Sequence, residues 1–136
     1  MKPGIFVDTS SWIAVSDRGE ANHTKAVHIF RQLMNRRGLL VTTNLVIAEA
    51  HILLRRRLGQ SAAMAFLDSL HQSAHVEIVY PGMEHELEAI RILKQFQDQD
   101  FSLTDAISFA VMRKSKITEA FSFDHHFVIA GFNILE

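Results

Sequence analysis

Short apolar segments rich in β-branched residues alternate along this chain with longer segments of helical periodicity. Residues 4–7, 39–42 and 76–79 have the composition of buried strands, and residues 120–123 and 132–135 are two shorter candidates. Between them, apolar residues recur at the spacing of one helix face. Strands that alternate with helices are typical of a parallel sheet covered by helices. The pattern therefore predicts an α/β sandwich with a mainly parallel central sheet.

The helical segments can be placed approximately from their caps and their apolar periodicity. In the segment that contains residues 87–96, the spacing predicts that Leu87, Ile90, Leu93 and Phe96 face the core. Between the last two strand candidates, His125 and His126 are expected to lie in a loop. The other expected helices span residues 9–15, 22–37, 45–58 and 62–70, and one more begins at residue 102.

Length and composition limit the class of protein. The 136 residues are expected to form one domain, residues 1–136. Hydrophobic residues make up 48% of the chain and charged residues 21%, which favours a compact globular fold over disorder. The formal net charge of −1 argues against an architectural nucleic-acid binder. It still allows a nuclease, because acids clustered in a site can mask basic patches elsewhere.

The chain shows no sign of export or of a membrane span. The first apolar run, residues 5–7, is stopped by Asp8, too early for a signal peptide. No stretch approaches the length needed to cross a bilayer. Cysteine is absent, which excludes disulfides and thiolate metal sites and suits a reducing compartment. We therefore expect a soluble, cytoplasmic protein.

Four acidic residues lie where predicted strands or helices begin or end, among apolar residues that are expected to be buried. They are Asp8, Glu49, Asp105 and Asp124. A carboxylate buried alone costs several kcal/mol or becomes protonated, so each needs a partner. Asp8 and Asp124 follow predicted strands, and ligands of parallel α/β sheets gather beyond the carboxyl ends of the strands.

Each of these acids also has a purely structural interpretation. Asp8 and Asp124 suit turns or helix caps. Glu49 lies in a helix that is apolar nearly all round, where an ion pair with Arg56 would satisfy it. Asp105 follows Ser102 with the spacing of a capping box.

Taken together, the four acids point to one site that the fold assembles. Ionised carboxylates a few Å apart repel one another strongly unless a cation neutralises them. Carboxylate-rich ligation without cysteine favours Mg²⁺ or Mn²⁺ over Zn²⁺. Such ions serve phosphodiester hydrolysis, because they activate water and stabilise charge on phosphoryl oxygens. We therefore expect a metal-dependent hydrolase, in which the metal activates water for in-line attack on the scissile phosphate.

Four segments of the chain resemble, in order and spacing, the four motifs of the PIN-domain ribonucleases. The segments are IFVDTS (residues 5–10), TNLVIAE (residues 43–49), FSLTDA (residues 101–106) and FSFDHHF (residues 121–127). The resemblance covers essentially the whole chain and implies a PIN-like three-layer α/β/α sandwich. It implies that Asp8, Glu49, Asp105 and Asp124 bind the metal and are catalytic. It also implies supporting roles beside these acids for Thr9, Ser10, Asn44 and Thr104.

Roles for His125 and His126 do not follow from the resemblance, because the fourth motif varies after its Asp. Phe127 is expected to pack in the core. The compact single-domain form is similar to VapC-type toxins of toxin–antitoxin pairs. This likeness implies a Mg²⁺- or Mn²⁺-dependent endoribonuclease with an RNA substrate, a cognate antitoxin and a homodimeric assembly, without membrane association. The alternatives are a non-catalytic PIN-like binding or regulatory module, a general RNA-processing nuclease, a DNA-directed nuclease and a phosphoacceptor receiver domain.

Overall fold

The computed structural model describes residues 4–36 and 38–135 of the chain. Five strands and seven helices are defined within these residues. In chain order they are β1 (Ile5–Val7), α1 (Thr9–Ser16), α2 (His23–Asn35), β2 (Leu40–Thr43), α3 (Asn44–Leu58), α4 (Gln60–Gln72), β3 (Val76–Val79), α5 (Met83–Gln95), α6 (Leu103–Lys114), β4 (Glu119–Phe121), α7 (His126–Ile129) and β5 (Asn133–Ile134). Arg37, the expected last residue of the second helix, lies outside the described residues.

The five strands form one sheet in the order β3-β2-β1-β4-β5, and every pair is parallel. The prediction of a mainly parallel sheet is confirmed. β1 lies at the centre, where Phe6 pairs with Val41 of β2 on one side and with Ala120 of β4 on the other. The first and the fourth strand are therefore neighbours although they are far apart in sequence.

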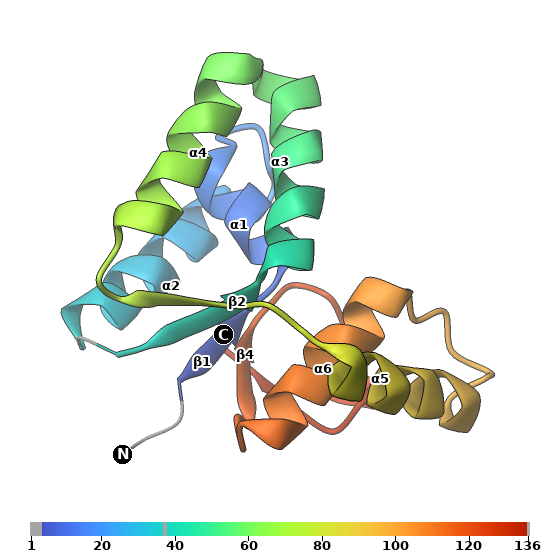
Figure 1. Cartoon of the computed structure of the whole chain (residues 1–136). Coiled ribbons are helices and arrows are strands. Elements are labelled where there is room, and N and C mark those ends of the chain that lie inside the picture. The colour runs from blue at the N-terminus through green and yellow to red at the C-terminus, as the bar shows by residue number, and fades with distance from the viewer. Residues whose placement is uncertain (1–3, 37, 136) are drawn as a thin grey trace.

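Helices cover both faces of this sheet, which makes three layers (Figure 1). The chain moves outward from β1 to β2 and β3 through α1–α4, then crosses β1 to reach β4 through α5 and α6. Because parallel crossovers are right-handed, reversing the direction of travel moves the connecting helices to the opposite face. Figure 1 shows α1–α4 together on one side of the sheet, with α5 and α6 on the other. The reversal opens a crevice beyond the carboxyl ends of β1 and β4, the usual ligand site in such sheets.

The core joins the central strands to both helical layers. Phe6, Phe121 and Phe109 are fully buried. Phe127 of α7 is also buried, as expected, and its ring centroid lies 6.1 Å from that of Phe6 and 5.0 Å from that of Phe109. These contacts fix α6 and α7 against the end of β1. The position of the chain immediately after β1 and β4 is therefore well defined.

Two expectations about local structure were wrong, the first of them in part, because Leu93 and Phe96 do pack against the core as expected. Leu87 and Ile90 of α5 are 52% and 38% exposed, and Ala89 and Ile92 are buried in their place. The helix carries two apolar stripes, and the one that contains the small Ala89 packs inward. In addition, the segment after β4 is not a plain loop, since His126 begins the short helix α7.

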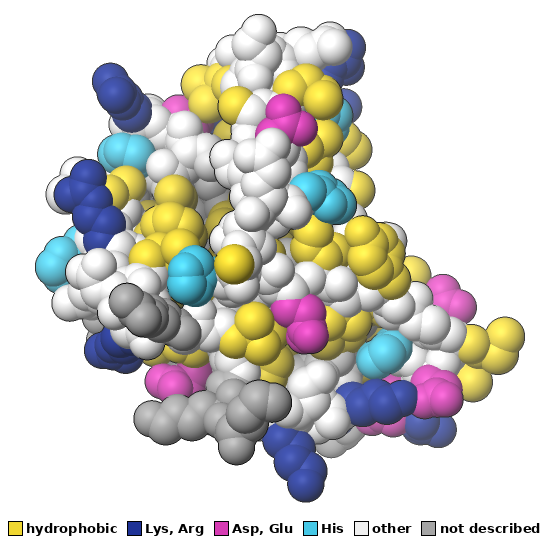
Figure 2. Space-filling model, turned by 60° about the vertical axis from the view of Figure 1, so that its left-hand side comes forward, with side chains coloured by type: hydrophobic (Ala, Val, Ile, Leu, Met, Phe, Trp, Pro, Cys, Tyr) yellow, Lys and Arg dark blue, Asp and Glu magenta, His cyan; other side chains and the backbone are white. Residues whose placement is uncertain are grey.

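Large hydrophobic side chains remain exposed on several elements. The most exposed are Tyr80, Met83 and Leu87, at 64%, 76% and 52%. Figure 2 shows that hydrophobic side chains also reach the surface on the face drawn there, in groups separated by polar surface. Within residues 4–36 and 38–135, no helix has both the length and the hydropathy needed to cross a membrane.

Candidate functional site

A cavity of about 260 Å³ lies at the crevice beyond β1 and β4, and all four predicted acids line it. Asp8 comes directly after β1, and Asp124 is the third residue after β4. Asp105 lies in the first turn of α6, and Glu49 in α3. Residues separated by more than 100 positions in the chain thus meet at one place. Because strand order and right-handed crossovers create the crevice, the fold itself gathers these side chains.

Asp8 is the buried member of the set, with 6% of the residue exposed. Its Oδ1 accepts hydrogen bonds from Ser10 Oγ at 2.7 Å and from the backbone N of Ser11 at 3.3 Å. Its Oδ2 accepts one from Ser122 Oγ at 2.9 Å. The bond from Ser11 caps the N-terminus of α1, so the structural and the functional interpretation of Asp8 apply together. The hydrogen bonds fix the orientation of the carboxyl group.

Burial raises the pKa of Asp8 to about 7 from an ordinary value of 3.8. The hydrogen bonds from Ser10, Ser122 and Ser11 work in the opposite direction, and the negative charge of Asp124 adds to the rise. A carboxyl group with a pKa near neutrality binds a proton readily, because little else nearby neutralises its charge. A bound cation would supply that neutralisation.

Asp105 takes part in the capping box that the sequence predicts. Its backbone N donates to Ser102 Oγ at 3.0 Å, and its Oδ2 accepts from the backbone N of Ser102 at 3.1 Å. The first turn of α6 is therefore rigid, and a carboxylate placed there is further stabilised by the helix dipole. From this turn the side chain reaches the cavity.

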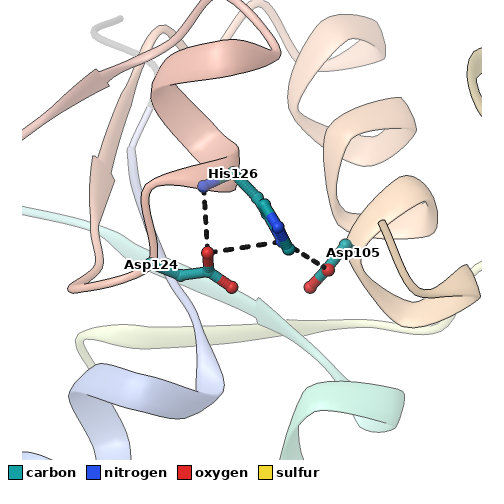
Figure 3. A group of neighbouring side chains, drawn as sticks. All are labelled: Asp105, Asp124 and His126. Carbon is teal, nitrogen blue, oxygen red and sulfur yellow. Dashed lines mark hydrogen bonds and ion pairs between the residues drawn. The ribbon is translucent and has the colours of Figure 1, made fainter. Parts of the chain in front are cut away.

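Asp124 and Asp105 lie on either side of the imidazole of His126 (Figure 3). Nδ1 of His126 is 3.4 Å from Asp124 Oδ1 and 3.3 Å from Asp105 Oδ2. The backbone N of His126 also donates to Asp124 Oδ1, at 2.9 Å. In the described part of the chain, these three residues form the group whose potential ligand atoms all lie within 4.8 Å of one another. The carboxylates of Asp8 and Glu49 line the same cavity but stand outside that group.

Glu49 differs from the expectation that it is buried. It is exposed, and so are its helix neighbours Ala48 and Ile52. The buried face of α3 consists of Val46, Ile47, Ala50 and Leu54. Glu49 therefore does not need a partner for its charge, and the proposed ion pair with Arg56 is not among those described. Its side chain borders the cavity from the solvent side.

The four residues expected to support the acids lie in different places. Ser10 contacts Asp8 directly, and its Oγ also accepts from the backbone N of Phe123 at 2.9 Å. Thr9 and Thr104 line the cavity without a described side-chain hydrogen bond to an acid. Asn44 is the first residue of α3 and is outside the cavity wall, and its Oδ1 is buried without a partner among the described residues. Thr43, the residue before it, caps that helix by accepting a hydrogen bond from the backbone N of Val46 at 3.1 Å.

Two further residues contribute to the site: the sequence did not point to Ser122, and it indicated Arg57 only as one of three consecutive arginines, residues 55–57, that either end a helix in solvent or contact phosphate. Ser122 binds Asp8 from the end of β4, which only the strand order could reveal. Arg57, at the end of α3, lines the cavity with its Nη1 3.6 Å from Asp17 Oδ2 and 3.4 Å from Glu20 Oε1. Among the described residues of the cavity wall, Arg57 is the one Lys or Arg. A cation beside a group of carboxylates suits an anionic ligand such as a phosphodiester.

The donor set fits a hard divalent cation. Carboxylate oxygens are the ligands that Mg²⁺ and Mn²⁺ prefer. Five carboxylates line the cavity, with one Arg at the wall, and leave an excess of negative charge there; they belong to Asp8, Glu20, Glu49, Asp105 and Asp124. Oδ1 of Asp8 accepts two hydrogen bonds, whereas Oδ2 accepts one and keeps a further lone pair that an ion could use. The residues are therefore compatible with one or two such ions.

Comparison with known proteins gives consistent results. Residues 5–133 match the family model of the PIN domain. The "23S rRNA-specific endonuclease VapC20" of Mycobacterium tuberculosis is 37% identical over 128 residues, which cover 94% of this chain and 95% of that protein. The "Ribonuclease VapC26" of the same organism is 29% identical over 102 residues, 75% of this chain and 73% of that protein.

Two solved structures are similar as well. The crystal structure of M. tuberculosis VapC20, described as a "Sarcin-Ricin loop cleaving toxin", has a TM-score of 0.84 and 36% identity, covering 95% of this chain and 96% of that one. The structure of FitAcB from Neisseria gonorrhoeae has a TM-score of 0.65 with 14% identity, over 97% of this chain and 96% of that one. The second likeness concerns the fold alone.

Proposed function

Because the chain belongs to the PIN-domain family, we propose that it is a divalent-metal-dependent endoribonuclease that acts in the cytoplasm as the toxin of a toxin–antitoxin pair. The observation that carries the proposal is the convergence of Asp8, Glu49, Asp105 and Asp124 on one cavity. A purely structural role for each acid would not place all four around the same space. The relatives at 37% and 29% identity are both named as nucleases, which supports RNA as the substrate.

In this proposal Asp8, Asp105 and Asp124 hold Mg²⁺ or Mn²⁺, and Glu49 completes the set from the exposed side of the cavity. When bound, the ion would supply a nucleophile from water and neutralise charge on the scissile phosphate. Ser10 and Ser122 keep the carboxyl group of Asp8 in a fixed orientation. Arg57 lies where it can contact a phosphate of the RNA backbone.

The first test measures RNA cleavage by purified protein with Mn²⁺, with Mg²⁺ and with EDTA. Wild-type protein is expected to cleave with either ion and to be inactive in EDTA. Asp8→Asn is expected to lose at least about a hundredfold in rate, because it removes a charged ligand at the buried side of the site. Asp98→Asn, an exposed acid outside the cavity, is the matched control and should cleave normally. Undiminished cleavage by a folded Asp8→Asn variant would exclude Asp8 from the mechanism.

The substrate class can be tested with paired oligonucleotides. A stem–loop from 23S rRNA is the first choice, because the relative at 37% identity is named for that RNA. A DNA oligonucleotide of the same sequence and a scrambled RNA serve as controls. Cleavage of the DNA at an equal rate would contradict the proposal of an endoribonuclease. Arrest of growth on expression, relieved by Asp8→Asn or by a co-expressed small partner, would support the toxin role.

A further inference from the structure

The position of His126 beside two proposed metal ligands distinguishes it from the other histidines of the chain. Its Nδ1, and not only its backbone, faces the carboxylates of Asp105 and Asp124. The imidazole is 27% exposed and its ring packs edge-on against Phe101, with the centroids 5.1 Å apart. The backbone bond from His126 N to Asp124 Oδ1 further fixes the start of α7. The ring is therefore oriented by its packing against Phe101 and by the backbone bond to Asp124, in addition to the contacts of Nδ1.

The spacing of the three donor atoms suits a shared ion. Neighbouring ligand atoms of an octahedral ion lie about 3 Å apart when the metal–ligand bonds are about 2.1 Å long. Nδ1 of His126 lies 3.3 Å from Asp105 Oδ2 and 3.4 Å from Asp124 Oδ1, and one ligand atom from each of the three residues lies within 4.8 Å of the others, so adjustments of side-chain torsions would bring them to a shared ion. Neutral imidazole binds metal through Nδ1 as well as through Nε2.

We propose that His126 is a direct nitrogen ligand of the ion held by Asp105 and Asp124, and that it gives the site a preference for a first-row transition ion such as Mn²⁺ over Mg²⁺. The inference rests on the proposed function, because it concerns the ion at the same site. Imidazole nitrogen suits first-row transition ions, whereas Mg²⁺ strongly favours oxygen. A set of four carboxylates alone would lack this source of preference.

Nitrogen ligation can be observed directly. The full-length protein is loaded with one equivalent of Mn²⁺, and electron spin echo envelope modulation detects ¹⁴N bonded to the ion. Wild-type protein is expected to show imidazole nitrogen modulation. His126→Gln should lose it, and His125→Gln, which changes the exposed neighbouring histidine, should retain it. Bound Mn²⁺ without nitrogen modulation in the wild-type protein would overturn the assignment of His126 and leave the carboxylate site intact. Failure of Mn²⁺ to bind at all would contradict the proposed function itself.

Ion selectivity gives the second readout. Isothermal titration calorimetry on wild-type protein is expected to show tighter binding of Mn²⁺ than of Mg²⁺. In His126→Gln the affinity for Mn²⁺ should fall about tenfold or more, with a smaller change for Mg²⁺. His126→Asp restores a ligand but makes the set all-oxygen, so it should bind Mg²⁺ at least as well as the wild type while lacking the nitrogen signal. Equal losses for both ions in folded His126→Gln would contradict the preference.

Discussion

At the scale of single residues, the four acids have unequal environments. Asp8 is buried as expected, Asp105 and Asp124 are partly buried, and Glu49 is exposed. A sequence can show that a carboxylate stands among apolar residues. It cannot show which side of a helix packs inward when nearly every side is apolar, as in α3. Glu49 does line the cavity, as expected, but the expectation rested on its burial, and the structure shows that it is exposed.

The raised pKa of Asp8 predicts that stability depends on pH. The folded protein keeps a proton on Asp8 up to about pH 7, whereas the unfolded chain loses it near 3.8. The free energy of unfolding should therefore fall as pH rises between these values, and stay level above them. The difference of about three units between the two pKa values corresponds to a loss of at most about 4 kcal/mol in the free energy of unfolding. Urea unfolding in EDTA at pH 5 and pH 8 covers about two pH units of this range, for which the expected loss is at most about 3 kcal/mol.

Asp8→Asn is the matched variant for this experiment, because the amide cannot ionise. It should be more stable than wild-type protein at pH 8 and should lose this part of the pH dependence. Added Mn²⁺ should stabilise the wild-type protein at pH 8 more than the variant. Identical profiles for the two proteins would show that Asp8 does not carry the effect.

At the scale of elements, the capping box was predictable because it depends on residues only three positions apart. Ser102 and Asp105 make both of its hydrogen bonds. The face of α5 that packs inward was not predictable in the same way. The helix has two apolar stripes, and packing against α6 decides which of them is buried. The strand order also depends on contacts between distant parts of the chain. Local sequence marks where strands lie, but only packing of the whole chain places β4 beside β1.

Ser102→Ala should lower the free energy of unfolding by about 1 kcal/mol, because it removes the acceptor for the backbone N of Asp105. Ser115→Ala, at the other end of α6, is the control and should change stability far less. Urea titration at one pH compares the two. A loss in Ser102→Ala no larger than in Ser115→Ala would mean that the cap contributes little.

The end of α3 predicts how RNA is bound. Arg57 is held by Asp17 and Glu20 from the loop between α1 and α2, and it borders the cavity. Arg57→Ala should weaken RNA binding measured in EDTA. The slope of the logarithm of the binding constant against the logarithm of the salt concentration should become shallower by about 1, because one phosphate contact is lost. Arg55→Ala, on the same helix but outside the cavity wall, should change both less. Equal effects of the two substitutions would indicate a general charge effect.

At the scale of the whole molecule, one exposed surface has the character of an interface. Tyr80 and the α5 residues Met83, Leu87 and Ile90 are all at least 38% exposed, and the three α5 residues follow one another at helical spacing. We propose that this surface is covered in the homodimer that the likeness to VapC-type toxins implies. The expected inward face of α5 is thus in part an outward one, which the periodicity alone could not distinguish.

Leu87→Glu is expected to convert a dimer into a monomer, because it places a charge in a contact that must exclude water. Light scattering coupled to size-exclusion chromatography measures the mass. Met64→Glu, which changes an exposed apolar residue of α4, is the control and should remain dimeric. A monomeric wild-type protein at micromolar concentration would refute the homodimer, and a dimeric Leu87→Glu would place its interface elsewhere.

The pairing of β1 with β4 determines when, during translation, the proposed active site can form. The carboxyl group of Asp8 receives a hydrogen bond from Ser122, a residue that is translated 114 positions later. During translation, the residues of β1 are synthesised long before those of β4, with which they pair. Asp105 and Asp124 emerge late as well, so the incomplete chain has no assembled cavity. The site of the proposed nuclease therefore cannot be complete before Asp124 has been synthesised.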